Sequence, residues 1–215
     1  MQRMRVTFSR GEELKYLSHL DMMRLWERAL RRAGISIAYS QGFSPHPKIS
    51  MAAPLPLGVT SEGELVDLFI SRRISPYALP KTLGNQLPKG ISILSVSQVP
   101  PEAPALQTQL RRAEYRVDIE TDKTADEIKS AIDSFLALKE LPWQHKRDAE
   151  MRSYDLRSLV ERVWFIEMRG TLCVLGMCLR ADNSASGRTE QVALALGFDK
   201  RPKSICRTRL FLVGE

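Results

Sequence analysis

The order of predicted strands and helices constrains the fold more than any other feature of this sequence. Alternating apolar residues at 5–9 predict a first strand, and Ser18 followed by Asp21 is the signature of a helix N-cap. Apolar residues then recur at three- and four-residue steps as far as Gly34, a residue type that commonly ends helices. The sequence therefore predicts a strand and then a helix. Its expected apolar face comprises Leu20, Met23, Trp26, Leu30 and Ala33.

The remaining elements of the first half complete a β-α-β-β-α-β order. Proline at the first turn favours a second helix after Ser75, and Pro88 ends it. The other predicted elements are strands at 35–40, 65–71 and 91–99, with 49–57 as an extended continuation of the second strand. This order is that of a ferredoxin-like domain.

The same order recurs in the second half, after a proline-rich stretch typical of linkers. The predicted elements are a strand at 114–120, a helix at 125–138 opened by Thr124, an extended pair within 152–180, a helix at 190–196 and a strand at 205–213. Residues 153–165 could equally form a short helix. We therefore expect an α+β protein of two ferredoxin-like halves packed together. These are a domain at 1–100, a linker at 101–112 and a second, degenerate domain at 113–215.

Positive charge is concentrated near the start of the chain. The 215 residues carry a net charge of +7, and residues 1–48 hold nine Lys/Arg against four Asp/Glu, which is +5. Such an excess suits an anionic partner such as RNA, although it also occurs in basic domains that bind nothing.

Apolar runs and cysteines restrict the class of protein further. Runs such as 171–179 are far shorter than the roughly 20 residues of a membrane helix, and the first residues lack the apolar stretch of a signal peptide. Cys173, Cys178 and Cys206 form no CxxC pair and have no histidine at ligand spacing. We expect a cytoplasmic protein with no membrane contact, no metal and no cofactor.

Three arginines on the predicted first helix are candidates for anion binding. Arg24, Arg28 and Arg31 follow i, i+4, i+7 spacing, so they share one helical face. Guanidinium groups suit phosphates because they donate in a bidentate fork and keep their charge. The alternative is a solvated face with internal ion pairs, for example between Arg24 and Asp21.

The glycine- and proline-rich loop at 41–48 presents an aromatic ring, a hydroxyl, an imidazole and an ammonium group. Phe43 could stack on a base, Ser44 could bond a phosphate together with Lys48, and His46 could donate or exchange a proton. The alternative is a rigid surface turn in which Phe43 fills the core.

His19 and His46 are the candidate catalytic residues. If the fold brings them together, two imidazoles could act as acid and base in the cleavage of a phosphodiester. The alternative for His19 is a structural role at the helix cap.

Two arginines of the second half complete the candidate anion-binding set. Arg157 belongs to the run Tyr154-Asp155-Leu156-Arg157. Arg188 lies within a small-residue stretch, 184–189, that precedes a predicted helix and could receive a phosphate with Arg188 beside it. A plain connection is the alternative.

Several motifs resemble the radical-SAM-linked domain of unknown function, which occurs alone or behind B12-binding radical SAM proteins. They are Ser18-His19-Leu20-Asp21, residues 27–33, residues 39–48, residues 54–58, Glu64 with Asp67, residues 154–157, Gly187-Arg188 and Arg207. The resemblance implies a B12-binding radical SAM protein as partner. The chain lacks the CxxxCxxC motif of such enzymes, so the resemblance implies an accessory role.

The leading hypothesis is an accessory protein that binds tRNA or rRNA, is linked to a radical SAM enzyme and catalyses no reaction of its own. Two alternatives stay open. One is a metal-independent endoribonuclease that uses His19 and His46, and the other is a protein-interaction module for a radical SAM partner.

Overall fold

The computed structural model describes residues 1–147 and 150–215, and it confirms the mixed α+β class. The backbone divides into two compact units, Met1–Leu110 and Arg111–Glu215. In the described part of the chain, no helix is both long and apolar enough to cross a membrane.

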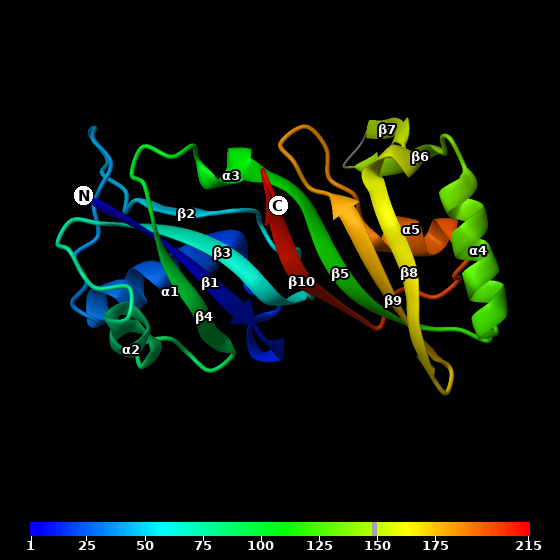
Figure 1. Ribbon diagram of the computed structural model, residues 1–215, viewed down its shortest axis with the longest axis horizontal. Coiled ribbons are helices and arrows are strands. Elements are labelled where there is room, and N and C mark those ends of the chain that lie inside the picture. The colour runs from blue at the N-terminus through cyan, green and yellow to red at the C-terminus, as the bar shows by residue number, and fades with distance from the viewer. Residues whose placement is uncertain (148–149) are drawn as a thin grey trace. The chain divides into compact units, whose positions relative to one another are not determined.

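Unit 1 is an antiparallel sheet with two helices whose side chains contribute to its hydrophobic core (Figure 1). Its elements are β1 (Gln2–Arg10), η1 (Glu12–Leu14), α1 (His19–Arg32), β2 (Ile49–Met51), β3 (Thr60–Ile70), α2 (Ala78–Gly84), β4 (Ile91–Val99) and α3 (Leu106–Gln109). The strand order is β4-β1-β3, with β2 also paired to β3, and each of these pairs is antiparallel.

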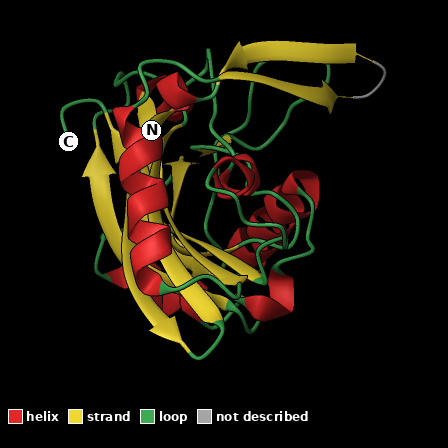
Figure 2. Ribbon diagram, turned by 90° about the vertical axis from the view of Figure 1, so that its right-hand side faces the viewer, coloured by secondary structure: helices red, strands yellow, loops and turns green. Residues whose placement is uncertain are grey.

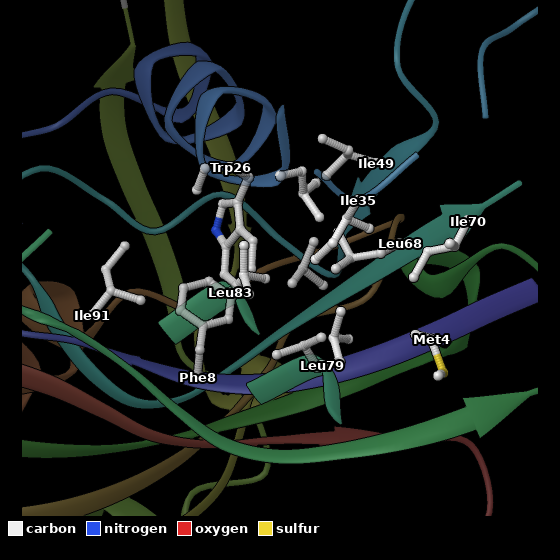
Figure 3. Packing of buried hydrophobic residues seen from close by; sticks show 14 of the residues in the cluster. Met4, Phe8, Trp26, Ile35, Ile49, Leu68, Ile70, Leu79, Leu83 and Ile91 are labelled. Carbon is white, nitrogen blue, oxygen red and sulfur yellow. The ribbon is translucent and has the colours of Figure 1, made fainter. Parts of the chain in front are cut away.

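The core of unit 1 lies between α1, α2 and one face of the sheet. Alternate residues of β1 and β3 point into it, because successive side chains of a strand lie on opposite faces. The rings of Phe8 and Trp26 meet edge to face, with centroids 4.9 Å apart (Figure 3). Burying one such side chain is worth about 1.5–3 kcal/mol, so these contacts fix α1 against the sheet.

The predicted first helix is confirmed, but its apolar face is shifted. The Ser18 side chain accepts a hydrogen bond from the Asp21 amide, and Gly34 follows the helix with φ +67°. The buried residues of α1 are Met22, Trp26, Ala29 and Leu30. Leu20 is exposed, contrary to expectation, because the helix turns its Met22 side toward the sheet.

The predicted strand at 35–40 is wrong. Ile37 and Tyr39 form only isolated bridges, while the short strand β2 pairs with Val66, Leu68 and the residue between them. Ile35 packs into the core, and the Ala38 amide bonds the Phe69 carbonyl. Residues 35–40 therefore contact β3 only at single residues, and the regular ladder of hydrogen bonds with β3 is formed by β2.

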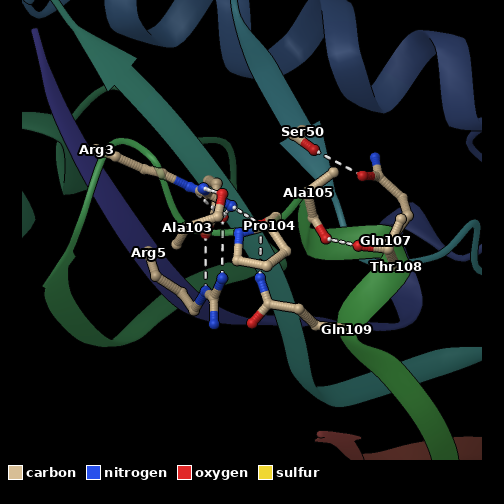
Figure 4. Close-up of polar contacts among 10 residues, drawn as sticks. Arg3, Arg5, Ser50, Ala103, Pro104, Ala105, Gln107, Thr108 and Gln109 are labelled. Carbon is tan, nitrogen blue, oxygen red and sulfur yellow. Dashed lines mark hydrogen bonds and ion pairs between the residues drawn. The ribbon is translucent and has the colours of Figure 1, made fainter.

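The stretch after β4 packs onto the sheet face opposite α1. Arg3 donates to the carbonyls of Ala103 (2.6 Å) and Pro104 (2.9 Å), and Ser50 donates to Gln107 (Figure 4). Leu106 of α3 is buried. Part of the 101–112 segment is thus fixed to unit 1 by hydrogen bonds.

Unit 2 has strands in the order β10-β5-β9-β8, and its pairs β5–β9 and β9–β8 are antiparallel. Its elements are β5 (Leu110–Glu120), α4 (Ala125–Ala137), β6 (Pro142–Arg147), β7 (Glu150–Asp155), η2 (Arg157–Leu159), β8 (Val160–Arg169), β9 (Leu172–Arg180), α5 (Thr189–Ala195) and β10 (Ser204–Leu212). A capping box between Thr124 and Glu127 starts α4, as predicted. Helix α4 lies along the sheet, and β6 and β7 form a separate hairpin that projects from it (Figure 2).

Candidate nucleic-acid interface

Helix α1 positions the predicted arginine stripe toward solvent. Its buried residues fix one side against the sheet, and Arg24, Arg28 and Arg31 are exposed. At 100° per residue the three lie within an arc of about 60°, and they extend along about 10 Å of the axis. The sequence thus correctly predicted an exposed row of three guanidinium groups.

The first arginine of the stripe is partly neutralised. Arg24 Nη1 lies 3.5 Å from Asp21 Oδ1. The Ser18 hydroxyl donates to the Asp21 carboxylate and, with Arg24, holds its pKa below the ordinary value. Arg28 and Arg31 form no ion pair with any residue that the structure describes. Uncompensated positive charge therefore increases toward the C-terminal end of α1.

The loop after α1 is a hydrogen-bonded hairpin. The Ser40 amide donates to the His46 carbonyl at 2.8 Å, and the Ser40 hydroxyl accepts from the His46 amide at 2.9 Å. The Lys48 amide donates to the Ala38 carbonyl, and the Lys48 carbonyl accepts from Phe69 of β3. These bonds anchor the base of the loop to the C-terminal end of β3.

The tip of the loop is open to solvent. Phe43 is fully exposed, so the alternative in which its ring fills the core is wrong. Ser44 and His46 are exposed as well, and Lys48 is half-buried. Gly42 has φ +131°, a conformation that side chains rarely adopt, so the turn that presents Phe43 requires glycine.

The two candidate catalytic histidines are not brought together. His19 is the first residue of α1 and follows Lys15 by four residues. The Lys15 carbonyl accepts a hydrogen bond from the Gly58 amide, just before the start of β3. His46 lies in the loop anchored at the other end of β3. An 11-residue strand is about 33 Å long, whereas a shared phosphodiester requires both imidazoles within hydrogen-bonding reach of it. The geometry therefore opposes the endoribonuclease hypothesis.

The two ends of unit 1 differ in charge. Residues 28–61 and 68–101 contain no Asp or Glu and eight Lys or Arg. These segments meet where α1 and β3 end, because the Ser71 amide donates to the Ser36 carbonyl at 2.9 Å and Arg32 donates to the Gln86 carbonyl. This surface, which we call the basic end, carries Arg28, Arg31, Arg32, Lys48, Arg72, Arg73 and Lys81.

Two acidic side chains of unit 1 lie at the opposite end, whereas Glu102 is an exposed acid near the basic end, because it follows β4, whose Val99 pairs with Arg3 at the start of β1. Glu12 and Glu13 follow β1 at the opposite end, where they pair with Lys15 (2.6 Å) and Lys89 (3.2 Å). Asp21 lies on the first turn of α1. The acids at the opposite end are therefore paired with lysines, whereas Arg28 and Arg31 at the basic end form no ion pair with any described residue.

The sequence interpretation missed four cations of the basic end: Arg32, Arg72, Arg73 and Lys81. Arg72 and Arg73 precede the second helix and have no helical spacing, so no local pattern singles them out. The absence of acidic residues from two long segments was the available signal. These segments form one surface only because the fold brings Ser36 and Ser71 together.

Arg157, which the sequence suggested for anion binding, donates hydrogen bonds from its guanidinium group to backbone carbonyls. The acceptors are the carbonyls of Val160 (2.6 Å) and Leu136 (3.2 Å), the latter at the C-terminal end of α4. Asp155 accepts from the amides of Leu141 and Arg157 itself. The Tyr154-Asp155-Leu156-Arg157 run therefore joins α4, β7 and β8.

The small-residue loop before α5 is occupied by its own hydrogen bonds. Asp182 accepts from Arg180 and from the amides of Ser184 and Ala185. Burial alone would raise the pKa of Asp182, but these bonds hold it well below its usual range. Helix α5 has seven residues, too short for a phosphate site at its start.

Arg188 remains exposed before α5, near Tyr154. The Tyr154 hydroxyl donates to Gln191. Burial raises the pKa of Tyr154, and the positive charge of Arg188 partly opposes that shift.

The three cysteines are free and buried. Burial raises the pKa of Cys173 to about 11, which disfavours its thiolate. In the described part of the chain, no three His, Cys, Asp or Glu side chains are grouped to hold a metal ion.

The fold and this surface define a mixed α+β protein whose first unit has one predominantly basic end. The chain belongs to the family described as "uncharacterized protein conserved in bacteria" (DUF2344), whose model matches residues 3–189. No curated protein matches the chain.

One solved structure shows a likeness of fold. The chain is similar to one of a Cbf5–Nop10–Gar1 complex, with 14% identity, a TM-score of 0.54 and coverage of 99% of this chain and 50% of that one. A chain of an archaeal box H/ACA sRNP Nop10–Cbf5 complex gives 12% identity, a TM-score of 0.48 and coverage of 96% and 46%. This chain thus spans about half the length of the structures it matches.

Proposed function

We propose that this protein is an accessory RNA-binding protein whose unit 1 contacts the phosphate backbone. The observation that carries the proposal is the basic end, where Arg28 and Arg31 of α1 lie exposed without an acidic partner in the described structure. Phosphate contacts supply most of the affinity of non-specific RNA binding, and arginine is suited to them. Lys48, Ser44 and His46 extend the surface onto the loop.

Each unit is, in this proposal, a ferredoxin-like fold. The β-α-β-β-α-β order and the β4-β1-β3-β2 sheet support this for unit 1. In unit 2 the order β10-β5-β9-β8 corresponds to it, with the β6–β7 hairpin inserted after α4. Such sheets recur among RNA-binding modules.

Fluorescence anisotropy with total tRNA and structured rRNA fragments at two salt concentrations tests RNA binding. Replacing Arg24, Arg28 and Arg31 with Glu changes the charge by 3 × (−2) = −6, from +7 to +1. The matched control changes three exposed lysines of unit 2, Lys129, Lys139 and Lys200, to Glu. Salt-sensitive binding that disappears only in the arginine variant supports the proposal. RNA binding that does not depend on salt concentration, or an equal loss of affinity in both variants, contradicts the proposal.

A second candidate is a module that docks on a partner protein, and an apolar patch at the opposite end of unit 1 favours it. The Tyr16 side chain is 73% exposed and lies over Gly58, next to exposed Leu57. Exposed apolar groups that cluster commonly mark protein contacts. From the motif resemblance, the proposed partner is a B12-binding radical SAM protein.

Size-exclusion chromatography of the chain mixed with such a protein tests this candidate. Tyr16→Ser with Leu57→Ser should abolish co-elution, and Phe43→Ser, at the basic end, should preserve it. Absence of any complex with the wild type contradicts the candidate.

A further inference from the structure

Three exposed aromatic side chains share the basic end with the cations. Phe43 is fully exposed, Tyr77 is 88% exposed and Tyr39 is 52% exposed. None of the three stacks on another ring or on a cation among the described residues. The faces of these rings are therefore available to a ligand.

Backbone contacts place these residues at one end of unit 1. Tyr39 and Pro47 form an isolated bridge at the base of the loop, and Ile37, two residues earlier, bridges to Ile70. Gln2 pairs with Ile70 and bonds both the amide and the carbonyl of Ile74, three residues before Tyr77. The loop tip and the start of α2 thus flank the paired termini of β1 and β3. Figure 1 shows both segments at the end of the unit marked by the N-terminus.

Cations alternate with the rings around this end. Arg72 and Arg73 lie between β3 and Tyr77, and Arg31 and Arg32 end the helix that leads into the loop. All four are exposed. Exposed rings interspersed with uncompensated cations match the two requirements of an unpaired nucleic-acid strand, which are base stacking and phosphate neutralisation.

A duplex does not meet these requirements equally well. Its bases are stacked on one another and offer no free faces to Phe43, Tyr39 or Tyr77. An acidic peptide would engage the cations but would gain little from three ring faces. The combination therefore favours single-stranded RNA over both.

We propose that the basic end binds an unpaired RNA segment, with bases stacked on Phe43, Tyr39 and Tyr77 and phosphates held by Arg31, Arg32, Arg72 and Arg73. This inference rests on the proposed RNA binding and specifies its substrate class. It adds Tyr39, Tyr77, Arg72 and Arg73 to the site.

Anisotropy titrations with a 12-nucleotide oligouridine and with a 12-base-pair RNA duplex test the inference. The wild type should bind the single strand more tightly. Tyr39→Ser with Tyr77→Ser should weaken single-strand binding by about tenfold or more and leave duplex binding within about twofold, since stacking contributes only to unpaired bases. Tyr39→Phe with Tyr77→Phe should retain binding, because a phenyl ring also stacks.

Tyr16→Ser is the control, since Tyr16 is a tyrosine at the opposite end whose exposure, 73%, lies between those of Tyr39 and Tyr77. It should leave both affinities unchanged. Arg72→Gln with Arg73→Gln should lower the salt dependence of single-strand binding by about 0.7 for each phosphate that the variant no longer neutralises.

The outcomes separate the inference from the proposed function. Salt-sensitive binding that is equal for both RNAs, or unaffected by the Tyr39/Tyr77 serine variant, overturns the single-strand inference and leaves RNA binding intact. If polyglutamate at an equal concentration of charges displaces the oligouridine, the surface recognises negative charge alone. That result also overturns the single-strand inference. Absence of salt-sensitive binding to either RNA contradicts the proposed function itself.

Discussion

Arg3 and Asp67 form an ion pair inside unit 1, with Arg3 Nη2 2.6 Å from Asp67 Oδ2 and both side chains almost fully buried. Arg5 reaches the other oxygen of the same carboxylate, at 2.8 Å from its Nε. One buried carboxylate thus serves two guanidinium groups, and Arg3 also holds the segment after β4 through two carbonyls. The loss of one member of a buried ion pair leaves an uncompensated charge, which costs more than the pair contributes.

Replacing Asp67 with Asn should therefore lower the free energy of unfolding by about 3–5 kcal/mol. Urea denaturation followed by circular dichroism measures it. Asp122→Asn, at an exposed position, is the control and should change little. A loss below about 1 kcal/mol at Asp67 would show that the two arginines find other partners.

Asp155 should make the free energy of unfolding depend on pH in the acidic range. The Leu141 amide, followed by that of Arg157, lowers the pKa of its carboxyl below the ordinary 3.8. Because the folded pKa is lowered, the stabilisation is complete above 3.8 and disappears as the pH falls through the lowered value. Asp155→Asn should thus be less stable than the wild type at neutral pH, and the difference should shrink below 3.8. Chemical denaturation across this pH range tests it, and a constant difference would refute the assigned cause.

Gly176 of β9 should tolerate no side chain. A Cβ at this position would lie 2.0 Å from Trp164 Cε2, on the neighbouring strand β8. Gly176→Ala should destabilise the protein by about 1–3 kcal/mol, and adding Trp164→Leu should recover part of the loss. Gly84→Ala is the control, because a Cβ there meets nothing within 4 Å. Thermal unfolding of the three variants decides the question, and an unchanged midpoint for Gly176→Ala would mean that the indole moves aside.

Two single substitutions, one at each end of unit 1, should have different effects on RNA binding. Arg31→Gln removes an unpaired charge from the basic end, and Lys89→Gln removes one already paired with Glu13 at 3.2 Å. The first should reduce the slope of log K against log salt by about 0.7–0.9, and the second should leave it unchanged. Equal slopes for both variants would indicate that RNA does not distinguish the two ends.

Local sequence signals predicted the elements whose determinants lie within a few residues. Ser18 with Asp21, Thr124 with Glu127, and Gly34 set helix boundaries through short-range hydrogen bonds and backbone conformation. The exposed arginine row on α1 followed from the helical period. The strand predicted at 35–40 failed because a strand is defined by its hydrogen-bonded partner, and the segment that forms a regular ladder with β3 beside β1 proved to be β2.

The sequence by itself determined the α+β class, the net charge of +7 and the helix caps, because each depends on composition or on neighbours in the chain. Tertiary structure alone decided that His19 and His46 lie at opposite ends of β3, that Arg157 binds backbone carbonyls, and that Arg72, Arg73 and Tyr77 join the loop carrying Phe43. The physical reason is that these relationships depend on contacts between residues far apart in the chain, namely β1–β3 pairing and the Ser36–Ser71 contact in unit 1 and the Arg157–Leu136 bond in unit 2.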